Sequence, residues 1–280
     1  MKRGGSLFRR TSKILQHVFL ILLTLSVLLP LFYILITSLK SHEEYLVNKL
    51  NLPGRIVLRN YYRIFVEQRF LPLILNSGIL TAFAGLGALV ISCLAAFAYA
   101  DFRFPMRNAL YVAFLSLMSV PPIVMITPLF KQLAGLHLVN TRLGVVLIYV
   151  GLTVPFSVYL LTSFFKTIPS ELHDAARIDG CSELGYLVRV VLPLSKPSIA
   201  TCLLVNGVWV WNELLIAVVC LQQDMLRTLM VGIMLRIGNF QVDVPLVTTG
   251  LVVASIPIMG LFFAFQKWFI RGLVQGAIKS

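Results

Sequence analysis

The chain of 280 residues has few charged or metal-binding side chains: Asp and Glu number 11, His 4 and Cys 4, and only 12% of residues are charged. Cys93, Cys181, Cys202 and Cys220 have no CxxC spacing and the histidines are scattered, so neither a disulfide framework nor a metal cluster is indicated. We expect these cysteines to be small buried hydrophobes or free thiols. Neither a GxxxxGK[ST] phosphate loop nor a Ser-His-Asp constellation is present, so we expect no cofactor, no catalytic residues and no ATP hydrolysis by this chain.

Apolar residues are abundant, at 58% of the chain with a mean hydropathy of +0.89, which excludes one or two ordinary soluble domains. Six apolar runs are long enough to cross a membrane. We predict spans at residues 14–39, 73–100, 109–130, 143–165, 199–221 and 244–270. The first run is too long for a signal peptide and no small-residue cleavage site follows it. The sequence therefore predicts an all-α integral membrane protein with six transmembrane helices.

The net charge of +13 could indicate a nucleic-acid partner, but Lys and Arg are spread through the loops without a basic-aromatic cluster. We therefore expect no nucleic acid. Six spans place residues 1–13, 101–108, 166–198 and 271–280 on one side of the membrane. With Lys267 at the end of the last span, this side holds 14 of the 24 Lys and Arg residues. Positive loops favour the cytoplasmic side, so we expect cytoplasmic termini and a cytoplasmic loop at 166–198.

This loop contains a polar stretch, SELHDAARIDGCSELGYLVRVVLPLSKP, at residues 170–197. We expect two short helices, the first capped by Ser170 and the second by Ser182, with a turn at Gly180 and an end at Pro193 and Pro197. On spacing alone, the stretch could lie as an amphipathic segment on the lipid surface. One face of the first helix is expected to carry Leu172, Ala175, Ala176 and Asp179.

The run from Asp174 to Gly180, followed by Leu192-Pro193, resembles the EAA loop of permease subunits in ATP-binding-cassette (ABC) importers. Its Leu-Pro-Leu-Ser-Lys-Pro continuation is similar to the carbohydrate branch of that family, which includes maltose-type transporters. Asp174 stands where the family usually has Glu, and Cys181 where it often has Ala. The resemblance implies that a coupling helix in this loop docks on an ATPase. The residues concerned are Glu171, Leu172, Asp174, Ala175, Ala176, Arg177, Asp179 and Gly180.

The same resemblance implies the partner subunits of the chain and its location. It would pair with a second permease subunit in a heterodimer, in the lipid of a bacterial or archaeal cytoplasmic membrane. Two ABC ATPases would bind ATP and Mg²⁺ on the cytoplasmic side, and an extracytoplasmic solute-binding protein would deliver the substrate. The resemblance does not decide whether the solute is a sugar, a polyol or a glycerol phosphate.

The predicted fifth span contains the polar run Trp209-Val210-Trp211-Asn212-Glu213. Asn206 and Glu213 are seven residues apart and share a helix face, near Trp209 and Asn212, while Trp211 is turned away. Rings and amides suit sugar hydroxyls, so Asn206, Trp209, Asn212 and Glu213 are candidates for the substrate path, with Asn76 of the second span. For Glu213 we favour a structural role between spans.

A stand-alone secondary transporter is the alternative function. It would need coupling carboxylates in the membrane, and Glu213 is the only carboxylate that lies deep in a predicted span. A membrane enzyme is a third class, which lacks a catalytic constellation in the sequence.

Overall fold

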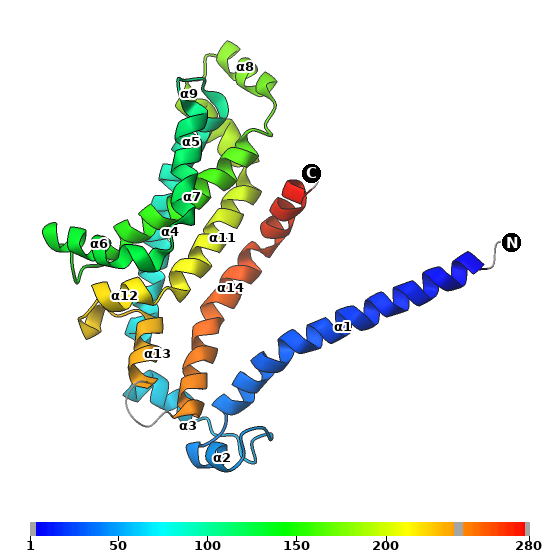
Figure 1. Ribbon diagram of the computed structural model, residues 1–280, viewed down its shortest axis with the longest axis vertical. Coiled ribbons are helices and arrows are strands. Elements are labelled where there is room, and N and C mark those ends of the chain that lie inside the picture. The colour runs from blue at the N-terminus through cyan, green and yellow to red at the C-terminus, as the bar shows by residue number, and fades with distance from the viewer. Residues whose placement is uncertain (1–3, 238–242, 278–280) are drawn as a thin grey trace. The chain divides into compact units, whose positions relative to one another are not determined.

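The computed structural model describes residues 4–237 and 243–277, and no strand occurs within these two ranges (Figure 1). The prediction of an all-helical protein is confirmed. The chain divides into two units, which are described separately. The first unit contains residues 1–69 and 235–253, and the second contains residues 70–234 and 254–280.

The first unit contains the long helix α1 (Gly4–Ser38) and the beginning of α14 (Val244–Ala277). Three short helical elements follow α1 in a segment that the sequence indicates only as a polar loop. They are α2 (His42–Val47), α3 (Arg59–Tyr62) and the π-helical turn η1 (Arg63–Glu67).

Side chains from this segment hold the two long helices of the first unit. The Asn60 amide donates to the carbonyl oxygens of Ser38 and Lys40, at 3.0 and 2.8 Å, and so caps the end of α1. The guanidinium of Arg63 pairs with Asp243, directly before α14, at 2.8 Å.

The core of the second unit is formed by three long helices that lie side by side (Figure 1). They are α4 (Phe70–Asp101), α7 (Arg142–Phe165) and α11 (Lys196–Asn212), and the most extensive contact joins α4 to α7. Small residues permit close approach: a Cβ on Gly87 would lie 2.9 Å from Val150 Cγ2, and one on Gly207 would lie 3.2 Å from Leu261 Cδ2. Gly87 therefore lies at the contact between α4 and α7.

The predicted third span is broken sharply. It consists of α5 (Arg107–Ser116), the short 3₁₀ turn η2 (Leu117–Ser119) and α6 (Pro122–Gly135), with a bend of 100° (Figure 1). Val120 and Pro121 are extended, with ψ of 116° and 129°. A residue before proline is pushed out of the helical region, so the Pro121-Pro122 pair separates two helices and does more than kink one.

The predicted fifth span is also interrupted. α11 ends at Asn212, Glu213 is extended with ψ of 129°, and the short helix α12 (Leu215–Cys220) follows. The segment beyond it contains the 3₁₀ turn η4 (Asp224–Leu226) and α13 (Leu229–Ile237), which the sequence analysis did not predict.

Four described helices are long and apolar enough to cross a membrane, and the number is six if each of two bent pairs counts as one span. The four are Lys13–Ser38, Phe70–Asp101, Arg142–Phe165 and Val244–Trp268. The bent pairs are α5 with α6, and Glu183–Leu194 with α11, which meet at 79°. The six predicted spans correspond to the upper end of this range.

Candidate functional site

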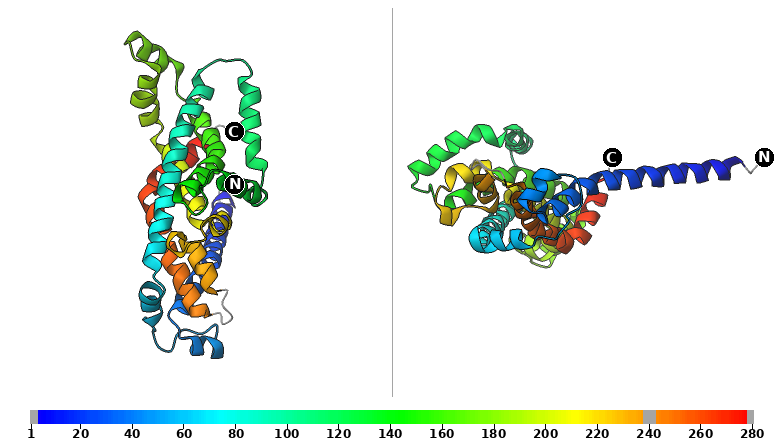
Figure 2. Two further views of the ribbon diagram at one scale, coloured as in Figure 1. Left: turned by 90° about the vertical axis from the view of Figure 1, so that its left-hand side faces the viewer. Right: turned by 90° about the horizontal axis from the view of Figure 1, so that it is seen from below.

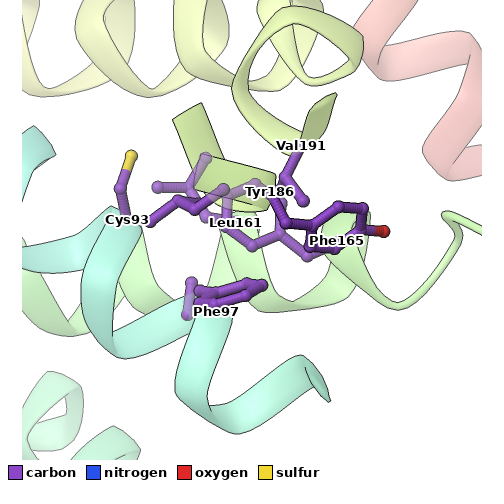
Figure 3. Close-up of a cluster of buried hydrophobic side chains, with 8 residues drawn as sticks. Cys93, Phe97, Leu161, Phe165, Tyr186 and Val191 are labelled. Carbon is purple, nitrogen blue, oxygen red and sulfur yellow. The ribbon is translucent and has the colours of Figure 1, made fainter. Parts of the chain in front are cut away.

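The predicted coupling loop is anchored on the cytoplasmic ends that we predict for α4 and α7. Its second half is continuously helical through α9 (Glu183–Tyr186), the π-helical turn η3 (Leu187–Val191) and α10 (Leu192–Leu194). Tyr186, Leu187 and Val191 are buried against the two long helices (Figure 3). The apolar cluster that they join contains Cys93, Ala96 and Phe97 of α4 and Leu161 and Phe165 of α7. This packing ties the loop to the spans.

The first helix of the loop, α8 (Ser170–Ile178), is held on this anchor by polar contacts. The His173 ring stacks on Tyr186 with 4.5 Å between centroids, and its Nε2 lies 2.9 Å from Glu183 Oε2. Arg177 donates from Nε and Nη2 to Glu183 Oε1, at 3.1 and 2.7 Å. The Arg177 guanidinium, followed by His173, holds the pKa of Glu183 below its ordinary value although partial burial opposes this.

The outward face of α8 differs from the predicted one at one position. Leu172 and Ala175 are exposed as expected, but Ala176 is turned inward and packs on the apolar cluster. Ile178 takes its place outside, with 86% of its surface exposed. In Figures 1 and 2, α8 lies beyond the ends of α4 and α7. The face also carries Glu171, Asp174 and Asp179, all exposed.

The turn after α8 requires glycine. Gly180 has φ of +74°, its N–H donates to the Arg177 oxygen at 3.0 Å, and the Cys181 N–H donates to the Ala176 oxygen at 2.9 Å. These two bonds form a Schellman motif, which uses a left-handed residue at this position. Ser182 Oγ then accepts from the Gly185 N–H at 3.2 Å, which confirms the predicted second cap.

Two other local predictions for the loop were wrong. α8 begins at Ser170, so Pro169 and not Ser170 stands at the cap position, without a side-chain hydrogen bond. Proline is compatible with the first turns of a helix, where a donor is not needed. Pro193 accordingly lies inside α10, and the chain bends after it at Ser195.

The carboxylate of Glu213 occupies the break in the predicted fifth span. It accepts from the Ile216 N–H at 2.7 Å and the Ala217 N–H at 3.0 Å, which are the first orphan donors of α12. The Tyr149 hydroxyl on α7 donates to it at 2.6 Å, and the Trp209 ring meets the Tyr149 ring edge-on at 5.8 Å. Glu213 thus caps a helix inside the second unit and links it to α7.

The other candidates in this span separate into two groups. Asn206 is 3% exposed and donates to Ser157 Oγ of α7 at 2.7 Å, so it lies in a helix contact and not on an open surface. Trp211 is buried and donates to the Ala254 oxygen at 3.1 Å. Asn212 is exposed, and its amide donates to the Val208 oxygen at 2.8 Å. Asn206, Trp209 and Glu213 all contact α7, whereas Asn212, which the sequence places near the same face, is exposed.

Asn76 is likewise buried, in a network that holds the segment after α12. Its amide donates to the Met225 and Arg227 oxygens at 2.8 and 3.0 Å. Arg142, the first residue of α7, donates to the Asn76 carbonyl at 2.8 Å. The neighbouring Ser77 hydroxyl accepts from the Leu229 N–H at 2.8 Å. Asn76 therefore fixes a connecting segment.

Several residues of these sites were missed by the sequence analysis. Tyr149 and Tyr186 stand in apolar stretches without a distinguishing pattern, and His173 was noted only as one of the scattered histidines. In the sequence, Arg142 could be recognised only as a basic residue at the boundary of a predicted span. The spacing of ten residues between His173 and Glu183 has no meaning until the Gly180 turn folds the two helices together.

Long apolar helices, together with two bent helix pairs, define a multi-pass membrane protein whose loop helix α8 is exposed. Residues 88–275 match the family described as binding-protein-dependent transport system inner membrane component. The chain belongs to this family and is an integral, multi-pass inner-membrane permease of a binding-protein-dependent ABC importer. Such permeases bind no cofactor, and ATP is hydrolysed by a partner ATPase.

Individual relatives match along nearly the whole chain. The sulfoquinovosyl glycerol transport system permease protein SmoH of Agrobacterium fabrum is 33% identical, covering 96% of this chain and 95% of its own length. The arabinooligosaccharides transport system permease protein AraQ of Bacillus subtilis is 32% identical, covering 96% of each. In fold, the chain is similar to a bacterial ABC transporter that imports the acidic polysaccharide alginate, with a TM-score of 0.80, 24% identity and coverage of 96% and 99%.

Proposed function

We propose that this chain is one of two membrane-spanning subunits of a carbohydrate importer. The carbohydrate class is supported by its relatives, which are named for transport of sulfoquinovosyl glycerol, of arabinooligosaccharides, and of melibiose, raffinose and stachyose. A second permease, two cytoplasmic ABC ATPases, an extracytoplasmic solute-binding protein and the surrounding lipid complete the assembly. The side that holds residues 1–13, 101–108, 166–198 and 267–280 carries 14 of the 24 Lys and Arg residues, which supports a cytoplasmic position for these segments.

The observation that carries the coupling role is that α8 packs on the apolar cluster through Ala176 and exposes its opposite face. Leu172 and Ile178 expose apolar surface on a loop that the charge distribution assigns to the cytoplasm. Fully covering an exposed Leu or Ile side chain contributes about 1.5–3 kcal/mol, so most of this gain comes from Ile178, which is 86% exposed, and less from Leu172, which is 40% exposed. Glu171, Leu172, Asp174, Ala175, Asp179 and Gly180 form the docking face, with Ile178 added. Ala176 and Arg177 hold the helix on its anchor.

Movement of the ATPase is transmitted because α8 cannot move independently. The Arg177–Glu183 and His173–Tyr186 contacts join it to α9, and Tyr186 and Val191 join α9 to the spans. An ATPase that closes on ATP therefore shifts the cytoplasmic ends of α4 and α7 as a rigid body.

For the substrate path, Asn212 is the candidate that the second unit leaves exposed. Asn206, Trp209, Glu213 and Asn76 support the path by fixing the broken span and the segment after it. Asn206→Leu should therefore lower stability and leave the affinity for transported solute unchanged. Asn212→Leu should weaken that affinity.

Cross-linking tests the docking role. Ile178→Cys and Val188→Cys are each placed in a Cys181→Ala background of the reconstituted transporter, since both positions are exposed on the same loop. Ile178→Cys should cross-link to the ATPase and Val188→Cys should not. Labelling of Ile178→Cys in intact cells by a membrane-impermeant thiol reagent would place α8 outside and end the proposal. Transport by the purified chain alone would instead favour a secondary transporter.

The substrate class is tested separately, by binding assays on the companion solute-binding protein. Saccharide binding is expected. Binding of amino acids or peptides and not of any saccharide would overturn the carbohydrate assignment and leave the coupling role intact.

A further inference from the structure

Three cations lie next to the ends of three candidate membrane helices in the second unit. Arg103 follows the end of α4 at Asp101, Arg107 begins α5, and Lys166 follows the end of α7 at Phe165. The ends of spans lie at the depth of the lipid headgroups. Basic side chains at this depth face phosphate groups before they face bulk water.

Two open clefts share the arginine pair. One, of about 540 Å³, is lined by Arg103 and Arg107 with Asn108, Phe104 and Met106 and contains no carboxylate among its lining residues. The other, of about 550 Å³, adds Lys166. It also contains the carboxylates of Asp101 and Glu171 and extends to His173 of α8. The first cleft is therefore the more strongly positive of the two.

The arginine pair is held in place by the turn between α4 and α5. Met106 has φ of 59°, which is uncommon for a residue with a side chain and reverses the chain so that Arg103 and Arg107 line the same clefts. Arg107 also donates from Nη1 to the Phe102 oxygen at 3.1 Å. A guanidinium has five N–H donors, so this bond orients Arg107 and leaves most of its donors for a ligand.

Aromatic rings beside the clefts also indicate that the clefts lie at the depth of the lipid headgroups. The Tyr99 ring lies 5.0 Å from that of Tyr111 and 5.9 Å from that of Phe104, and the Lys166 ammonium lies 5.5 Å from the centre of the Tyr111 ring. Tyr is enriched where a membrane meets water. Exposed apolar side chains continue from the cleft along α5, at Met106, Leu110 and Val112.

We propose that the cleft between Arg103 and Arg107 binds the headgroup phosphate of an anionic phospholipid. Arginine pairs suit phosphate because each guanidinium donates two parallel hydrogen bonds to it. The lipid tails contact exposed apolar side chains of α5 such as Leu110. A zwitterionic headgroup brings an ammonium group close to the guanidinium groups, so the site discriminates against it. Because the adjoining cleft reaches His173, the bound lipid lies beside the coupling helix. The proposal holds whichever solute is carried.

Lipid binding to the purified, delipidated transporter in detergent tests this site by native mass spectrometry. Short-chain phosphatidylglycerol is the probe, with short-chain phosphatidylcholine and sodium phosphate as comparisons. Arg103→Gln/Arg107→Gln should bind phosphatidylglycerol about 30-fold more weakly, from about 1 kcal/mol per basic residue at a lipid surface. Arg55→Gln/Arg59→Gln is the matched control, since it removes the same charge at the same spacing from exposed positions, and it should bind as the wild type does.

The single variant Arg103→Gln serves if the double variant does not fold, and it should show part of the loss. Equal binding of phosphatidylglycerol by the wild type and these variants would overturn the proposal. Equal retention of phosphatidylcholine would overturn it too, because the headgroup charge would then not be recognised. Displacement of the lipid by an equal concentration of sodium phosphate would assign the site to a free anion and not to a lipid.

Discussion

The hydroxyl of Tyr149 donates a 2.6 Å hydrogen bond to the carboxylate of Glu213, across a separation of 64 residues in the sequence. The same carboxylate accepts the N–H groups of Ile216 and Ala217. A single acidic side chain at the break therefore caps α12 and links it to α7. Without it, the orphan donors of α12 would lie inside the second unit without an acceptor.

Tyr149→Phe should destabilise the protein without displacing the ring from Trp209. The loss of one hydrogen bond is expected to cost about 1 kcal/mol. Thermal unfolding of the purified transporter should show a lower midpoint. Tyr159→Phe is the control, because Tyr159 lies exposed on the same helix, and it should leave the midpoint unchanged. A wild-type midpoint for Tyr149→Phe would contradict the link.

Glu213→Ala should cost more, since it also removes the cap of α12, and cap losses are about 0.5–2 kcal/mol. Because the two side chains contact each other, the double variant Tyr149→Phe/Glu213→Ala should be less destabilised than the sum of the single variants. Strict additivity would show that the two groups do not interact.

Gly180 should tolerate asparagine better than alanine. A Cβ at this position meets no atom within 4 Å, so the penalty comes from φ of +74° and not from a clash. The left-handed conformation costs about 1–2 kcal/mol for most residues, and asparagine adopts it more readily. We expect substrate-stimulated ATP hydrolysis in reconstituted vesicles to fall in the order wild type, Gly180→Asn, Gly180→Ala. Gly180→Asp should also be poorly coupled. Normal stimulation in Gly180→Ala would mean that the turn does not set the position of α8.

The contact between α8 and α9 should depend on acid pH. Arg177, and next His173, lower the pKa of Glu183 from its ordinary value of 4.5. The stabilisation by the ionised carboxylate is therefore complete above pH 4.5 and is lost as the pH falls through the lowered folded-state pKa. A spin label at Ala175→Cys in a Cys181→Ala background should become mobile only in that acid range.

Glu183→Gln provides the matched comparison for this titration. It keeps the side-chain size and removes the charge, so the label should be mobile at neutral pH and should not respond to acid. A label in the Glu183→Gln protein that is as immobile as in the wild type would show that the anchor of α8 is apolar alone.

Asn76→Leu should loosen the segment after α12. The substitution removes the two hydrogen bonds that Asn76 donates to the Met225 and Arg227 carbonyl oxygens, and each such bond contributes about 0.5–1.5 kcal/mol. Trypsin should cleave after Arg227 roughly ten-fold faster, because local opening becomes more frequent. Asn212→Leu is the control, since Asn212 is exposed and does not contact this segment. Unchanged cleavage in Asn76→Leu would show that Ser77 alone holds the segment.

The sequence by itself determined the features that depend on composition and on neighbours in the chain. These are the helical membrane fold, the Gly180 turn and the Ser182 cap. Hydrophobic length, helical spacing and turn chemistry all act within a few residues, so they can be recognised without a partner.

Only the tertiary structure decided which groups meet. Asn76 bonds to the Arg227 oxygen 151 residues away, and Glu213 binds Tyr149 on another helix. Such pairs depend on how each helix is rotated and where it breaks, which is settled by packing across the whole unit. The same dependence turned Ala176 inward and Ile178 outward, because the Gly180 turn sets α8 against Tyr186.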